Sequence, residues 1–299
     1  MSYTSEKALN LVHYRVLSHT LMKEYRMKMY QVDAFTQELF RGNPAAVLVL
    51  DEWLDDGLMQ YIAAENNLAE TAFVKKIDDQ NFEIRWFTPT TEVDFCGHAT
   101  LASAWVLFKD YITHKTVKFH VKKLGIFIIS QASDGKILMN FPIRTAILLE
   151  QYPEILDQAL TKPFKCVYVN EQAYIVEYHN AQDVLDETPD LALLKQLGNL
   201  RTAITAHAAL DIAITANSEK YDCISRYFAP ANGINEDAVT GSIHTGIVPL
   251  WANKLGKTSL LAYQASARGG ELYCQILDNN RIEISGYGKL YFCGEIYLD

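Results

Sequence analysis

Two uncharged stretches constrain the fold of this chain more than any other feature of its sequence. They are residues 99–108, ATLASAWVLF, and residues 243–252, IHTGIVPLWA. A surface helix of a globular protein has one apolar stripe, whereas these stretches are apolar nearly all round. We therefore expect each of them to form a helix that is buried on all sides. Pro249 should kink the second helix or lie near its end.

Similar residues lead into both stretches. Each is preceded by a Phe-x-Pro motif, an aspartate in a loop and a glycine, at Phe87, Asp94 and Gly97 in one case and at Phe228, Asp237 and Gly241 in the other. Two such units about 140 residues apart indicate an internal duplication. A chance match of one short pattern is the alternative.

The rest of the chain alternates irregularly between strand and helix patterns. Helices are expected at 54–66 and from the capping run Thr188-Pro189-Asp190 to Gly198. Strands are expected at 29–35, 45–50, 68–74, 82–87, 117–120, 125–130, 137–141, 165–169, 174–178, 201–206, 211–215, 223–228, 271–277, 281–285 and 290–297.

The charge balance argues against nucleic acid as a partner. The chain has 27 basic and 36 acidic residues, a net charge of −9, whereas a duplex-binding protein needs a positive face. The one dense basic segment holds Lys115, Lys118, Lys122 and Lys123, which form either a solvated strand face or an anion patch.

The cysteine count and the hydropathy of the chain indicate in which cellular compartment the protein is expected. The five cysteines are odd in number and form no CxxC pair, which disfavours common zinc sites and favours a reducing compartment. No stretch approaches the roughly 18 apolar residues of a membrane span, and residues 1–26 lack the apolar run of a secretory signal. We expect a cytoplasmic protein without membrane contact. Residues 1–26 are expected to be an extension outside the fold, with an amphipathic targeting segment as the alternative.

The glycines before the two apolar stretches suggest anion binding. Free N–H groups and the positive end of a helix dipole favour a carboxylate or phosphate. Gly97 would offer such a site in one half of the chain, and Gly241 with Ser242 in the other. Two such helix starts facing each other would hold a small anionic substrate, although a structural turn explains each glycine equally well.

Glu70 is the most informative acidic residue. Period-two alternation places it on one strand face with Leu68, Ala72 and Val74. A carboxylate on an apolar face is costly unless it is paired or functional, and general acid/base catalysis is one such function. A solvated glutamate at the rim of the strand is the alternative.

Three further side chains lie close to the glycine motifs. His98 could bind a substrate carboxylate or carry a proton, or could cap its helix. Asp237 could orient a substrate amine or hydroxyl, or could also be a cap. Cys96 could be a thiolate base because a helix N-terminus lowers a thiol pKa. Two-base racemisation would require a second thiol, and Ala238 and Val239 occupy the matching place.

No nucleotide or metal motif accompanies these residues. The chain lacks a Walker loop, a Gly-x-Gly-x-x-Gly after a strand, an HExxH and a GxSxG. Nothing in the sequence requires a cofactor.

Five motifs follow one another along the chain. They are Gly42-Asn43-Pro44-Ala45-Ala46-Val47, Asn67-Leu68-Ala69-Glu70-Thr71-Ala72-Phe73-Val74, Phe87-Thr88-Pro89 with Cys96-Gly97-His98-Ala99-Thr100, Glu236-Asp237-Ala238-Val239-Thr240-Gly241-Ser242, and Ala267-Arg268-Gly269-Gly270. In this order they resemble the motifs of the phenazine-biosynthesis isomerase (PhzF-like) family, which is related in fold to diaminopimelate epimerase. The resemblance covers roughly residues 27–299.

The resemblance implies an α+β fold. Two pseudo-symmetric halves would each have a barrel-like mixed sheet wrapped around a central apolar helix, with the active site between them. The corresponding domains are residues 27–141 plus 285–299 and residues 142–284. A homodimer is expected on the same basis.

The resemblance also implies a function. Glu70 would be the acid/base of a cofactor-independent and metal-free isomerase, with His98 and Asp237 holding and polarising a small carboxylated substrate. Asn43, Gly97, Gly241 and Ser242 would bind that substrate. A family member of known chemistry isomerises trans-2,3-dihydro-3-hydroxyanthranilate.

The sequence departs from the family pattern in two places, and other functions stay open. Ala69 and Ala238 replace a common serine and a common proline. The alternatives are a cysteine-dependent racemase or epimerase that uses Cys96, and a non-catalytic scaffold that binds a small acid.

Overall fold

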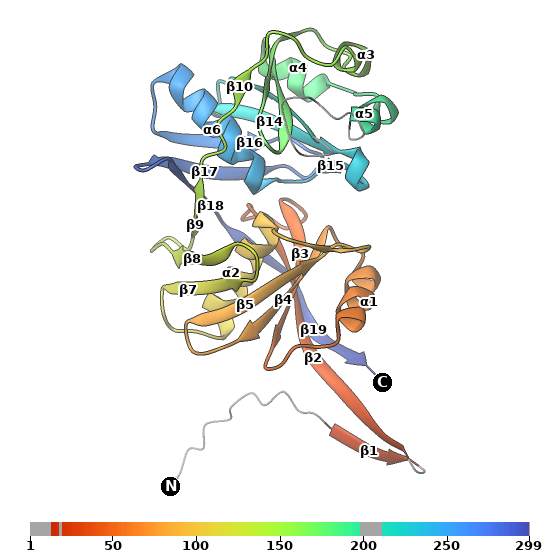
Figure 1. Ribbon diagram of the computed structural model, residues 1–299. Coiled ribbons are helices and arrows are strands. Elements are labelled where there is room, and N and C mark those ends of the chain that lie inside the picture. The colour runs from red at the N-terminus through yellow and green to blue at the C-terminus, as the bar shows by residue number, and fades with distance from the viewer. Residues whose placement is uncertain (1–12, 18–19, 198–210, 299) are drawn as a thin grey trace.

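The computed structural model describes residues 13–17, 20–197 and 211–298, which fold into two halves (Figure 1). Each half is a curved, mixed sheet around one helix. Helix α2 (Gly97–Asp110) lies in the first half and helix α6 (Gly241–Leu255) in the second. The α+β fold with a central helix in each half is therefore confirmed.

The strand pairing of the first half follows one repeating plan. Strand β3 (Asn43–Leu50) is parallel to β4 (Glu70–Lys76), and β4 is antiparallel to β5 (Asn81–Phe87). Strand β5 is parallel to β7 (Thr116–Val121), so α2 forms the crossover between them. Antiparallel pairing continues through β8 (Gly125–Gln131) to β9 (Ile137–Pro142).

The second half repeats this plan. Strand β12 (Ala173–Tyr178) is parallel to β13 (Asp211–Ala216), and β13 is antiparallel to β14 (Cys223–Ala229). Helix α6 forms the crossover from β14 to the parallel β16 (Ser259–Gln264). Antiparallel pairing then runs through β17 (Gly270–Leu277) to β18 (Arg281–Gly286). The same sequence of parallel and antiparallel pairs confirms the internal duplication.

The halves are joined through equivalent strands. The last strand of each repeat pairs with that of the other, because β9 is antiparallel to β18 from Ile137–Gly286 to Pro142–Arg281. Strand β19 (Gly288–Leu298) then returns to the first half and pairs with β2 (Thr20–Ala34). The domain bounds 27–141 plus 285–299 and 142–284 stay a prediction.

Both central helices are buried as their uncharged sequences predict. In α2, residues from Gly97 to Ala104 are buried without interruption, and in α6 so are those from Ile243 to Val248. Pro249 does not end α6, which continues to Leu255. Small residues on these helices let the surrounding strands approach closely on every side.

Several elements differ from their predicted bounds. The strand expected at 29–35 begins at Thr20 and forms a hairpin with β1 (His13–Leu17), so part of the proposed 1–26 extension has strand structure. The strand expected at 201–206 and Gly198 lie outside the described residues. Elements close to prediction are α1 (Asp56–Asn66), β11 (Phe164–Val169) and α5 (Leu191–Leu197). Elements not predicted are β6 (Glu92–Val93), β10 (Ile147–Leu148), α3 (Ile155–Ala159), α4 (Ala181–Asp186), η1 (Pro230–Asn232), β15 (Ile234–Asp237) and β16.

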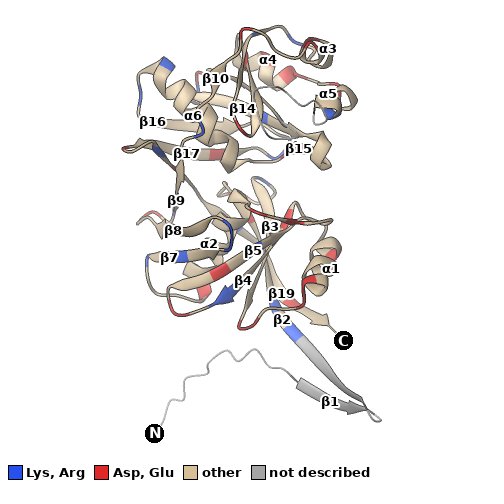
Figure 2. Cartoon of the chain, in the orientation of Figure 1, with Lys and Arg blue, Asp and Glu red and all other residues tan. Residues whose placement is uncertain are grey.

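Charges are mixed over both halves. Figure 2 shows basic and acidic residues interspersed along the strands and helices. In the lysine-rich segment, Lys123 forms a 2.7 Å ion pair with Asp94. Within the described ranges, none of the helices combines the length and the hydropathy that a membrane crossing requires.

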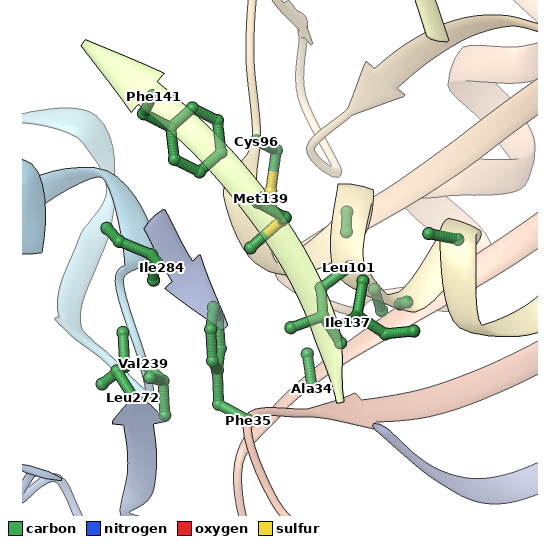
Figure 3. Close-up of a cluster of buried hydrophobic side chains, with 14 of the residues drawn as sticks. Ala34, Phe35, Cys96, Leu101, Ile137, Met139, Phe141, Val239, Leu272 and Ile284 are labelled. Atoms are coloured by element: carbon green, nitrogen blue, oxygen red, sulfur yellow. The ribbon is translucent and has the colours of Figure 1, made fainter. Parts of the chain in front are cut away.

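Phe35, in the loop after β2, contacts the second half through its backbone and its side chain. Phe35 is 1% exposed and packs in a cluster with Val239 and Leu272 of the second half (Figure 3). Its N–H donates to the carbonyl of Tyr287, and its carbonyl accepts the N–H of Glu271. Phe35 has a φ of +64°, which a non-glycine residue rarely adopts, so these contacts must hold it there.

Candidate active site

The N-termini of α2 and α6 meet between the two halves. A Cβ atom built on Gly97 would lie 3.8 Å from Cα of Gly241 and 3.8 Å from the backbone N of Ser242. The first N–H groups of a helix have no partner inside the helix and carry partial positive charge. The two glycine motifs, 144 residues apart in the chain (241 − 97), therefore bring two sets of amide donors to one place.

Glu70 lies at the first position of β4, inside the protein and not at a solvated rim. It shares a strand face with Ala72 and Val74, which pack in the same cluster as α2. Its side chain is 11% exposed. Among the described residues none donates a well-aligned hydrogen bond to Oε2, although Nε2 of His98 is 3.0 Å away. This distance permits an ion pair and leaves a buried carboxyl oxygen able to accept more.

His98 lies one residue after Gly97 and connects the halves through Asn43. Its ring is 5% exposed, and its Nδ1 lies 3.0 Å from Nδ2 of Asn43. The same Nδ2 donates to Oδ1 of Asp237 at 2.8 Å. The other carboxyl oxygen of Asp237 accepts the hydroxyl of Thr240. The structure thus brings Glu70, His98, Asn43 and Asp237 together, as the sequence motifs predict.

The buried charges of this cluster influence each other. Burial lowers the pKa of His98, but charges on Cys96 and Glu70 outweigh it, and the net pKa is raised well above its usual 6.5. Burial raises the pKa of Asp237, against His98 and the hydrogen bonds from Thr240 and Asn43, which lower it. The ionisation of His98 is therefore coupled to that of Asp237.

Cys96 is present at the site but is a poor thiolate. Burial, and then the charge of Glu70, raise its pKa to about 11. The expectation that the helix N-terminus would lower this pKa is therefore wrong. Because the thiol is uncharged near neutral pH, Glu70 is the neighbour that can favour a charged His98 there. Cys96 precedes α2 as Thr240 precedes α6, so its structural counterpart is Thr240 and not Ala238 or Val239, and the counterpart also lacks a thiol.

Within the described part of the chain, Glu70, Cys96 and His98 form a group that could hold a metal. Their ligand atoms lie within 4.8 Å of one another. Binding through Nε2 of His98 would require the ring proton to be on Nδ1. Nδ1 faces the N–H groups of Asn43, so the two donors would oppose each other. The donor set fits a metal poorly in this arrangement.

Residues without a local signal support the site. Arg268 donates from Nε to the carbonyl of Gly42 and from Nη2 to Asp33, both at 2.8 Å, and so holds the loop before Asn43. Gln264 accepts the N–H of Thr240 and donates to the carbonyl of Asp237. Arg268 belongs to a motif that carried the family resemblance, but its role depends on contacts across more than 200 residues.

Ser242 has a polar neighbourhood of its own. Nε2 of Gln172 donates to the Ser242 hydroxyl at 2.9 Å and to the Tyr227 hydroxyl at 3.0 Å. The Gln172 carbonyl accepts from Arg144 at 2.7 Å. The sequence pattern predicts Ser242 but gives no sign of Gln172 or Arg144, which lie in the loops before β12 and after β9.

Comparison with known proteins shows the family. The model of the phenazine biosynthesis-like proteins, PhzC-PhzF, matches residues 32–294. The chain belongs to this family. An uncharacterized isomerase of Pseudomonas aeruginosa is 40% identical over 272 residues, which are 91% of this chain and 99% of the relative. The family resemblance inferred from the five motifs is thereby confirmed.

Solved structures agree with the fold of this PhzF-like chain. The PhzF-family protein of Enterococcus faecalis is 38% identical, with a TM-score of 0.83 over 91% of this chain and all of the other. A predicted epimerase of P. aeruginosa is 18% identical, with a TM-score of 0.69 over 90% of this chain and 99% of the other. The latter likeness shows that the fold is shared with epimerases.

Proposed function

We propose that this PhzF-like protein is a cofactor-independent isomerase that moves a proton between two carbons of a small carboxylated metabolite, with Glu70 as the acid/base. The observation that carries the proposal is the buried Oε2 of Glu70, which accepts no well-aligned hydrogen bond from the described residues. An acid/base needs such an oxygen free to face its substrate. The isomerase names of related proteins support the reaction class.

The meeting of the two helix starts supports a carboxylated substrate. Amide donors at Gly97, Gly241 and Ser242 would hold a carboxylate within reach of Glu70 and His98. His98 and Asp237 would bind polar groups on the remaining part of the molecule. A compound such as trans-2,3-dihydro-3-hydroxyanthranilate combines a carboxylate with an amine and a hydroxyl, and so matches these donors and acceptors.

The reaction requires one proton and no redox partner. The Glu70 carboxylate takes a proton from one carbon, and the electron pair that is released shifts the double bond. The protonated Glu70 then returns the proton to another carbon. Amide donors and His98 would stabilise negative charge that develops on the substrate in between.

Isotope exchange tests this proposal. The protein is incubated in heavy water with trans-2,3-dihydro-3-hydroxyanthranilate and with a panel of small hydroxy and amino acids, and deuterium at carbon is followed by mass spectrometry. Glu70→Gln should lower exchange by about 10²–10⁴-fold, the usual contribution of a general acid/base. Glu65→Gln makes the same substitution at an exposed position of α1 and should retain wild-type exchange.

Three results would contradict the proposal. One is full turnover by Glu70→Gln on a compound that the wild type isomerises. The second is a panel compound that raises the melting temperature but undergoes no exchange, which would indicate a small-acid-binding scaffold. The third is loss of exchange in Cys96→Ala alone, which would favour the cysteine-dependent epimerase. The homodimer and the cytoplasmic location stay predictions from the sequence.

A further inference from the structure

Asn43 has an unusual set of contacts for a residue expected to bind substrate. It is the first residue of β3 and is 1% exposed. Its amide nitrogen lies 3.0 Å from Nδ1 of His98, 2.8 Å from Oδ1 of Asp237 and 2.9 Å from the carbonyl oxygen of Val239. All of these contacts are within the protein, and they leave this nitrogen little capacity for a substrate.

The orientation of the Asn43 amide is fixed by its oxygen neighbours. Asp237 Oδ1 and the Val239 carbonyl both face Nδ2, and a carbonyl oxygen can only accept. Turning the amide over would place Oδ1 against these acceptors, and the Val239 carbonyl cannot take a proton to relieve the repulsion. The N–H groups must therefore face this side of the site.

This orientation determines which nitrogen of His98 carries the proton. A neutral imidazole has one N–H and one acceptor nitrogen. Nδ1 faces this amide nitrogen, which cannot accept a hydrogen bond, and lies 3.4 Å from the Cys96 sulfur, whose uncharged thiol can donate to it. Nδ1 is therefore the acceptor nitrogen of the ring. The ring proton is then on Nε2, which lies 3.0 Å from Glu70 Oε2. The Glu70 carboxylate favours a charged His98 ring, which carries a proton on both nitrogens. Asn43 opposes this charged form, because the second proton would lie on Nδ1 and point at the N–H groups of the amide.

We propose that Asn43 is a positioning residue that keeps the proton of the neutral His98 ring on Nε2, which lies 3.0 Å from Oε2 of Glu70, and that connects the ring to Asp237 of the second half. The proposal rests on the proposed function, because it gives the predicted site residue Asn43 a role through His98 and Asp237 and not through substrate. This role is consistent with the burial of Asn43. A single amide can contact His98 of the first half and Asp237 of the second half only where the two halves meet, and there it is covered by both.

The position of the proton can be measured without a substrate. Nitrogen-15 NMR of imidazole-labelled protein distinguishes a protonated from an unprotonated ring nitrogen. The pH is raised from 7.5 until the His98 ring is neutral, because its pKa lies well above 6.5. The His98 signals are identified by their loss in His98→Gln among the eight histidines. The wild type should show Nε2 protonated and Nδ1 unprotonated. In Asn43→Ala and Asn43→Asp the Nδ1 signal should move toward the protonated form, because the opposing N–H groups are gone.

Asn81→Ala is the matched control. Oδ1 of Asn81 lies 3.0 Å from Nε2 of His120, so this variant also removes an asparagine contact to a histidine. It should change the His120 signals and leave those of His98 as they are. Should both Asn43 variants fail to fold, the wild-type spectrum alone decides. A proton on Nδ1 of the neutral wild-type ring would overturn the proposal.

Kinetics separate a positioning role from a direct substrate contact. With trans-2,3-dihydro-3-hydroxyanthranilate, Asn43→Ala should lower kcat by about 10²-fold, the lower range of acid/base effects, with little change in KM. A rise in KM at unchanged kcat would overturn the proposal in favour of substrate binding. If Glu70→Gln retains exchange while the NMR result holds, the proposed function fails and the placement of the His98 proton stands.

Discussion

Replacing Phe35 by alanine should loosen the junction of the two halves. The positions where Cβ atoms would lie on Gly241 and Gly286 are only 3.2 Å and 2.6 Å from its ring, so the glycines admit the ring where any other residue would collide with it. Gly241 also starts α6. The ring therefore supports the helix start that is proposed to bind the substrate carboxylate.

The expected cost follows from how little this pocket can collapse. Phe→Ala substitutions in cores cost about 3–5 kcal/mol, and more where the walls cannot relax. Here part of the wall is the backbone of Gly241 at the start of α6 and of Gly286 at the end of β18, and neither glycine has a side chain to fill the space. We expect about 4–5 kcal/mol. At about 2–4 °C per kcal/mol for chains somewhat shorter than this one, the melting temperature should fall by roughly 8–20 °C.

Phe40→Ala is the control that separates the effect of side-chain burial at Phe35 from the effect of its strained backbone angle. Phe40 also has a positive φ, +66°, but it is 67% exposed. Alanine replaces phenylalanine at nearly the same backbone angle in both variants, so the strain cancels. Thermal unfolding followed by circular dichroism should show a loss below about 1 kcal/mol for Phe40→Ala. The reasoning is refuted if Phe35→Ala unfolds at the same temperature as Phe40→Ala.

Two further predictions concern the helix starts and the core. Gly97→Ala adds a Cβ at ordinary contact distance, 3.8 Å from Gly241 and Ser242, so it should melt like the wild type. The methyl group would enter the space proposed for the substrate carboxylate and lower kcat/KM by about 10²-fold, and an unchanged kcat/KM would contradict that placement. His244 is 0% exposed, and burial lowers its pKa to about 4. Because the unfolded ring takes up its proton near pH 6.5, stability should fall as the pH drops from about 6.5 to 4, by about 3 kcal/mol in all. Urea unfolding at several pH values in this range gives the free energy of unfolding as a function of pH. This free energy should change less with pH in His244→Gln than in the wild type, and an equal change in both would argue against a buried neutral ring.

Much of the fold was predictable because its strongest signals are local. An uncharged run such as residues 99–108 has no solvent-compatible face, so its burial follows from the sequence alone. The position of Glu70 followed from alternation along one short strand. The long β2 strand was not predictable from its start, since Lys23, Glu24, Arg26 and Lys28 interrupt any apolar pattern there.

The interactions within the site could not be predicted from local pattern. The hydrogen bond between Asn43 and Asp237 joins residues that are 194 positions apart, and the sequence around either residue does not indicate the other as its partner. The state of Cys96 was predicted wrongly for a related reason. The helix terminus is visible in the sequence, whereas the burial and the neighbouring Glu70 charge that outweigh it arise only in the folded protein.

The duplication gives the protein two copies of one backbone with different side chains. Gly97 and Gly241 begin equivalent helices, but His98 follows the first and Ser242 the second. Electrostatic anchoring by main-chain groups can thus be retained in both copies while substitutions in one copy alter what is done to the anchored molecule. Such a scaffold can diverge toward new reactions while the proposed carboxylate-binding helix starts stay unchanged.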